Sequence, residues 1–186
     1  TNLIVRDLTV RDCMYDNIVV TNGNGHETTL NLLEALSTSG LKFGGFADDE
    51  RGQYPDRSRR VKARLGALLF RWETGCIEEN LIAAVPIDRM NHLIAHPQDG
   101  SGNRLRTLAV RLGCQDKAID VLRAQAGDRF VQHIVEAALG TVPVGKQDEK
   151  KTYKSHASIW FKSIEGGREI ADKIFALNLW PHFKPK

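Results

Sequence analysis

Three acidic residues, Asp48, Asp49 and Glu50, directly follow the apolar, glycine-containing run 43–47. In an α/β protein such a run is typical of a buried strand, and ligands gather at the carboxyl ends of parallel strands. Side chains two apart on a strand point the same way, so Asp48 and Glu50 are expected to project together. Neighbouring carboxylates repel unless a divalent cation lies between them, and their hard oxygens suit Mg²⁺ or Mn²⁺. The alternative is an acidic turn exposed to solvent.

A second pair of acids, Glu78 and Glu79, opens a predicted helix just after another apolar strand, 67–72. The helix dipole alone favours acids in a first turn. Placed near Asp48 and Glu50, however, the same acids could complete a metal site. Cys76 is interpreted as a packed thiol and not as a nucleophile, because the sequence fixes no histidine near it.

Basic residues follow the acidic motif and recur near the end of the chain. The first group forms either an ordinary solvated helix face or a surface that holds a phosphodiester backbone; it comprises Arg51, Arg57, Arg59, Arg60, Lys62 and Arg64. The second group could stabilise the charge that develops in phosphoryl transfer; it comprises Lys150, Lys151, Lys154 and Lys162. Trp160 and Phe161 are expected in the core and not as platforms for base stacking.

The order of elements predicts an α/β fold. Strands at 17–21, 42–47 and 67–72 alternate with helices at 26–39 and 57–65, which predicts a parallel sheet with right-handed crossovers. The glycine-rich turn 22–28 joins the first strand and helix, as an anion-binding turn or as a plain tight turn. The later apolar periodicity predicts helices at 78–85, 88–95, 104–112, 117–126, 130–139, 153–161 and 167–177. We therefore expect an α/β core at 1–85, a helical insertion at 86–145 and helices completing the core at 146–186.

Composition sets wide limits. The 186 residues carry a formal charge of +3, which permits nucleic acid as a partner without requiring it. Three cysteines without paired spacing argue against a disulfide framework and a zinc site, and they suit a cytoplasmic location. No apolar run approaches the length of a membrane span. The start at Thr1 suggests a fragment of a longer polypeptide.

Several segments resemble one family in the same order along the chain. They are 25–36, 43–50, 69–80, 104–109, 136–143, 153–157, 160–162 and 166–173. Together they look like the C-terminal TOPRIM region of the OLD (overcoming lysogenization defect) family, class 2-like, whose members are phage-defence nucleases. The resemblance covers most of the chain from about residue 22 onward. It implies a TOPRIM-type parallel sheet flanked by helices, with a largely helical insertion.

The resemblance also implies an activity and partners. It places Asp48 and Glu50 at the family's metal-ligand positions, with Asp49 between them, and matches Glu78 to the acid of the following helix, with Glu79 as an alternative. Lys162 matches the catalytic lysine, with Lys154 as the runner-up. These proteins are metal-dependent DNA endonucleases that use two Mg²⁺ or Mn²⁺ ions, so we expect a DNA surface formed by Arg57, Arg59, Arg60, Lys62 and Lys154. ATP would act only through an N-terminal ABC-type ATPase domain of the same polypeptide, and a homodimer is compatible with this scheme.

One feature departs from the family. TOPRIM domains open with a strand that ends in Glu-Gly, whereas Leu3-Ile4-Val5 is followed by Arg6-Asp7. Either the first strand precedes Thr1, or the motif is degraded and the module serves DNA docking or assembly without cutting. A phosphohydrolase of the haloacid-dehalogenase type is a third hypothesis, but it needs a nucleophilic aspartate after the first strand.

Overall fold

The computed structural model describes residues 25–48, 54–72, 74–96 and 102–183. The chain divides into two compact units, Leu3–Asn80 and Leu81–Lys186. The predicted boundary at residue 85 therefore falls a few residues inside the second unit. Among the described residues, no helix combines the length and apolar character that crossing a membrane requires.

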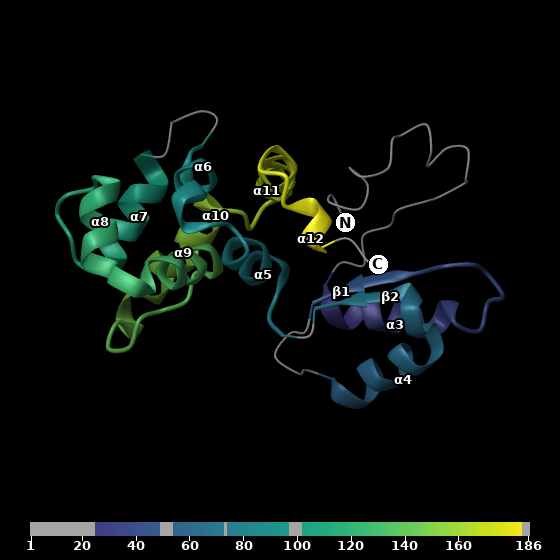
Figure 1. Cartoon of the computed structure of the whole chain (residues 1–186). Coiled ribbons are helices and arrows are strands. Elements are labelled where there is room, and N and C mark those ends of the chain that lie inside the picture. Colours follow the sequence, from purple (N-terminus) through teal and green to yellow (C-terminus); the bar gives the residue numbers. More distant parts are fainter. Residues whose placement is uncertain (1–24, 49–53, 73, 97–101, 184–186) are drawn as a thin grey trace. The chain divides into compact units, whose positions relative to one another are not determined.

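The first unit is built around a short pair of parallel strands. Strands β1 (Gly45–Ala47) and β2 (Leu69–Arg71) pair in register, with Phe46 opposite Phe70. Helices α3 (His26–Leu36) and α4 (Pro55–Leu65) pack against each other and against these strands (Figure 1). Their apolar faces meet in a small core of Leu30, Leu33, Val61 and Leu65, which Phe43 and Leu69 border.

The predicted TOPRIM-type sheet is wrong. Over the described residues, the only strands are β1 and β2, each three residues long, and helices make up most of the rest. The predicted strand 42–47 pairs only over its last three residues, and the 67–72 segment begins inside a 3-10 turn, Gly66–Leu68. Such short strands cannot form the broad twisted sheet on which a doubly wound fold depends. The predicted strand 17–21 lies outside the described residues.

The second unit is helical. Its elements are the end of α5 (Ile77–Ala83), η3 (Ile87–Arg89), α6 (Met90–Ile94), α7 (Gly102–Leu112), α8 (Ile119–Ala126), η4 (Gly127–Arg129), α9 (Phe130–Leu139), η5 (Gln147–Glu149), α10 (Lys150–Ile159), α11 (Ile164–Ala176) and α12 (Trp180–Phe183). Helix α7 packs against α8, α9 and α10, and α9 packs against α10. Leu108, Leu122, Ile134 and Trp160 are almost fully buried between these helices. A helix at each predicted position is confirmed, and the helix expected at 130–139 has those bounds.

Candidate functional site

Asp48 joins the end of one strand to the start of a helix. It directly follows β1, and its Oδ1 accepts the backbone N–H of Ile77 at 3.0 Å. Ile77 is the first residue of α5, which follows β2 along the chain. Because β1 and β2 are parallel, their carboxyl ends lie at one edge of the pair, where Asp48 meets Ile77. Asp48 therefore satisfies one of the backbone donors that every helix leaves unpaired at its N-terminus.

Glu79 also serves the start of α5. Its Oε2 accepts the backbone N–H of Cys76 at 2.8 Å, so the carboxylate reaches back to the residue before the helix. Gly75 makes this contact possible, because it has a φ of +70° and a Cβ there would lie 2.5 Å from that same oxygen. Asn80 closes the turn by donating to the carbonyl oxygens of Thr74 and Cys76, each at 2.9 Å. Glu79 is thus a capping residue.

Glu78 is buried in the same turn, with 7% of its surface exposed. Its carboxylate forms a hydrogen bond with the thiol of Cys76. Burial, a hydrogen bond with Glu78 and the negative charges of Glu78 and Glu79 raise the pKa of this thiol to about 12, against a weaker opposing effect of the Glu79 backbone N–H. Cys76 is therefore a neutral thiol near pH 7, which agrees with the packed-thiol interpretation. Asp48, Glu78 and Glu79 thus place several carboxylates at the start of α5.

The acids predicted to share a metal are only partly described. Asp48 and the Glu78–Glu79 turn meet at the start of α5, whereas Asp49 and Glu50 lie outside the described residues. Within the described ranges, no group of three or more His, Cys, Asp or Glu side chains is arranged to hold a metal ion. The glycine-rich turn before α3 falls largely outside the description as well.

The basic helix α4 is partly neutralised by α3. Arg60 donates to Glu34 at 2.9 Å and thereby lowers the pKa of that carboxyl, and Arg57 lies 3.7 Å from both Glu27 and Glu34. Arg59 pairs with Asp56 on its own helix, and both side chains are more than three-quarters exposed. Lys62 is exposed. Arg57 and Arg60 thus hold the two helices together, and Arg59 and Lys62 are exposed to solvent.

The two candidate lysines belong to the second unit. Lys154 lies on the exposed side of α10, and Lys162 is exposed in the turn between α10 and α11. Trp160 and Phe161, next to Lys162, are 1% and 3% exposed, so the expectation that they belong to the core is confirmed.

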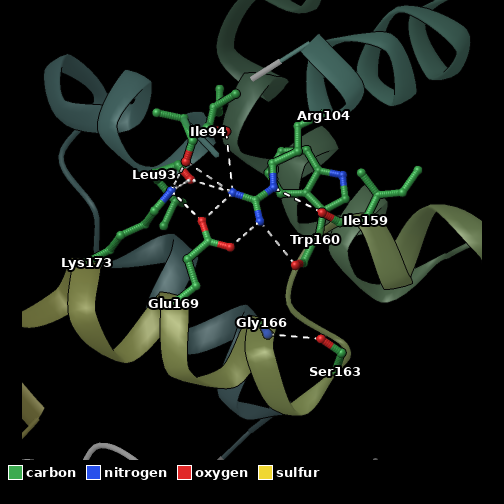
Figure 2. Close-up of polar contacts among 10 residues, drawn as sticks. Leu93, Ile94, Arg104, Ile159, Trp160, Ser163, Gly166, Glu169 and Lys173 are labelled. Atoms are coloured by element: carbon green, nitrogen blue, oxygen red, sulfur yellow. Dashed lines mark hydrogen bonds and ion pairs between the residues drawn. The ribbon is translucent and has the colours of Figure 1, made fainter. Parts of the chain in front are cut away.

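A buried cluster of polar contacts in the second unit was not predicted from the sequence. Arg104 has a side chain only 1% exposed and forms a two-pronged ion pair with Glu169, at 2.7 and 2.6 Å (Figure 2). Lys173 joins the pair at 2.8 Å from Glu169. One signal was available: Arg104 shares a helical face with Leu108 and Arg111, at spacings of four and three, and all three are buried.

Comparison with known proteins gives no relative: no family model, no curated protein and no solved structure matches this chain.

Proposed function

We propose that this chain is the nuclease part of a metal-dependent DNA endonuclease, which hydrolyses phosphodiester bonds with Asp48 and Glu78 among its metal ligands. The observation that carries the proposal is the meeting of Asp48 with the Glu78–Glu79 turn, reached from two different strands at one edge of the parallel pair. Acids converging from the ends of adjacent parallel strands are typical of sites that act on phosphates.

The local chemistry fits a hard divalent cation. Carboxylate oxygens are the ligands that Mg²⁺ and Mn²⁺ prefer. Burial is the main cause of the raised pKa of the Cys76 thiol, but the negative charges of Glu78 and Glu79 add to it, and the same charges favour a cation nearby. Asp48 and Glu78 would hold the ion, together with the predicted ligands Asp49 and Glu50. When bound, such ions activate water and stabilise the leaving oxygen.

The proposed DNA contacts are the exposed cations of each unit, namely Arg59 and Lys62 on α4 and Lys154 on α10. Arg57 and Arg60 are secondary, because Glu27 and Glu34 already neutralise them.

Replacing both Arg59 and Lys62 with Glu should weaken DNA binding regardless of DNA sequence and flatten its salt dependence. The matched control is the exchange of Arg57 and Arg60 for Gln, which should affect stability more than binding. We further propose that an N-terminal ABC-type ATPase domain of the same polypeptide uses ATP, that the protein is cytoplasmic and that it assembles as a homodimer.

A docking module that does not cut DNA is the second candidate. It is favoured by the capping roles of Asp48 and Glu79, which explain both acids without any metal. In that case the start of α5 is a structural joint, and the basic surface alone has a function.

Two substitutions at one position separate the candidates. Asp48→Asn keeps an oxygen that can accept the Ile77 N–H but loses the charge, whereas Asp48→Ala loses both. For an endonuclease, both variants of the full-length polypeptide should lose Mg²⁺- or Mn²⁺-dependent nicking of plasmid. Only Asp48→Ala should also lose stability, by about 1 kcal/mol, the usual cost of a lost helix cap.

Plasmid nicking by Asp48→Asn at the parental rate would refute the endonuclease proposal and leave the docking module. DNA binding measured on the same variants is the control, because neither substitution removes a proposed DNA contact.

A further inference from the structure

The turn between α10 and α11 carries Lys162 outward directly after two buried aromatic residues. Trp160 and Phe161 are almost fully buried, whereas Lys162 is exposed. The backbone N–H groups of Trp160 and Lys162 both donate to the carbonyl of Ala157, at 3.2 and 3.3 Å. These bonds close the end of α10 and set the direction in which the chain leaves the helix. The position of Lys162 therefore depends on what fixes the backbone of this turn.

Arg104, on α7, holds that backbone directly. Its Nε donates to the carbonyl of Ile159 at 3.1 Å, and its Nη2 donates to the carbonyl of Trp160 at 3.2 Å (Figure 2). The guanidinium also lies over the rings of Phe161 and Trp160, 4.6 and 5.5 Å from their centroids. One side chain thus contacts three consecutive residues that lead to Lys162.

Glu169 and Lys173, on α11, hold the guanidinium in place. The carboxylate of Glu169 accepts hydrogen bonds from both Nη atoms of Arg104 and pairs with the ammonium of Lys173. That ammonium also donates to the carbonyls of Leu93 and Ala95. Arg104 Nη1 lies 3.3 Å from the same Ala95 carbonyl. A planar fork with five donors can serve a carboxylate and several carbonyls at once, which an ammonium cannot. The cluster therefore ties the ends of α6 and α10 to α7 and α11.

The far side of the turn is fixed as well. Ser163 caps α11 by accepting the N–H of Gly166 at 2.9 Å. A Cβ at Gly166 would lie 2.7 Å from the Cα of Phe161, so the start of α11 rests against the turn's own backbone. Lys162 is held between these two anchors.

We propose that Arg104 is a positioning residue, which fixes the place of Lys162 through the main-chain carbonyls of Ile159 and Trp160. The inference rests on the proposed function and on the prediction from the sequence that Lys162 is its catalytic lysine. Misplacing a catalytic group by about 1 Å costs up to roughly a hundredfold in rate. Substitutions in the buried cluster are thus expected to lower the rate of turnover as well as the stability.

The test compares Arg104→Lys with Arg111→Lys. Arg111 is a matched control, because it lies on the same helix, is also buried, pairs with Glu136, donates to the carbonyls of Glu136 and Thr141 and lies over the ring of Tyr153. It makes none of the described contacts to the α10–α11 turn. Both variants should lose stability, but only Arg104→Lys should speed hydrogen exchange at the Lys162 amide, by about tenfold or more. Equal exchange in the two variants overturns the inference.

The second measurement is the rate of plasmid nicking by the full-length polypeptide, at a temperature below the unfolding temperature of each variant. Arg104→Lys should lower kcat for plasmid nicking by about ten- to a hundredfold at unchanged KM, and Arg111→Lys should not. If Lys162→Ala is slow while Arg104→Lys turns over like Arg111→Lys, positioning is refuted. If Lys162→Ala nicks at the parental rate, the catalytic role of Lys162 falls instead, and the exchange comparison alone decides whether Arg104 holds the turn. Should Arg104→Lys not fold, Glu169→Gln perturbs the same guanidinium and is expected to shift both measurements in the same direction.

Discussion

Glu169→Gln is the most informative single test of the buried cluster in the second unit. The carboxylate is 12% exposed and receives hydrogen bonds from Arg104 at 2.7 and 2.6 Å and an ion pair from Lys173 at 2.8 Å. Glutamine fills the same space but carries no charge. One of its two terminal atoms is an NH₂ group, which would have to face a cationic donor. The substitution therefore leaves two largely buried cations without their shared counter-charge.

The expected cost is about 3 kcal/mol, at the lower end of the values for removing one partner of a buried pair, because Glu169 keeps some exposure. The matched control is Glu149→Gln, which removes a carboxylate 2.7 Å from Lys146 in a pair whose side chains are about half exposed. Exposed pairs contribute about 0.2–1 kcal/mol, so this change should be small. At roughly 4 °C per kcal/mol, the Tm of Glu169→Gln should fall by about 10 °C or more.

Urea unfolding followed by far-UV circular dichroism measures both variants at pH 7. Acid titration adds an independent check. Burial acts to raise the pKa of Glu169, but hydrogen bonds from Arg104 and Lys173 outweigh it and hold the pKa below 4.5. A lowered pKa means that the stabilisation is complete above about pH 4.5 and is lost as the pH falls through the folded-state pKa. The difference in the free energy of unfolding between parent and variant should therefore be constant down to that pH and become smaller below it. A cost below about 1 kcal/mol at pH 7, equal to that of Glu149→Gln, would refute the reasoning.

Three further predictions concern the start of α5 and a buried histidine. Gly75→Ala should destabilise the first unit by about 1–3 kcal/mol in thermal unfolding, because a Cβ at a φ of +70° would collide with Glu79, and an effect below about 0.5 kcal/mol would contradict the described turn. Cys76, with a pKa of about 12, should react very slowly with iodoacetamide at pH 8, and Glu78→Gln should speed the reaction; a parent thiol that reacts like free cysteine would contradict the burial of Cys76 beside Glu78. Burial, followed by the charges of two arginines, lowers the pKa of His156, so stability should decline as the pH falls from 7 through the ordinary pKa of about 6.5, and a parent profile that matches His156→Gln between pH 7 and 5 would contradict this.

The sequence by itself determined the helices and much of the core. Apolar residues at helical spacing placed α9 and the main body of α7, and Leu108 and Ile134 are buried as that spacing requires. Local periodicity suffices here, because a helix makes its backbone hydrogen bonds within the segment and needs tertiary contacts only for its apolar face. The sequence also marked Asp48 at the end of one strand and Glu78 at the start of the helix after the next, although it did not show that Asp48 accepts the N–H of Ile77.

Only the tertiary structure decided the extent of the sheet and the tasks of the charged residues. A strand depends on a partner far away in the sequence, so the runs at 42–47 and 67–72 could not reveal that only three residues of each would pair. Likewise, the type of a charged residue does not reveal which side chain it pairs with in the folded protein. Arg57 and Arg60 pair with acids of α3, which the sequence did not predict, and Arg104, given no role from the sequence, is buried at the centre of four elements. Apart from the last residues of α6, each of these partners lies 23 residues or more away along the chain. Only folding brings them within 3–4 Å of the side chain that they contact.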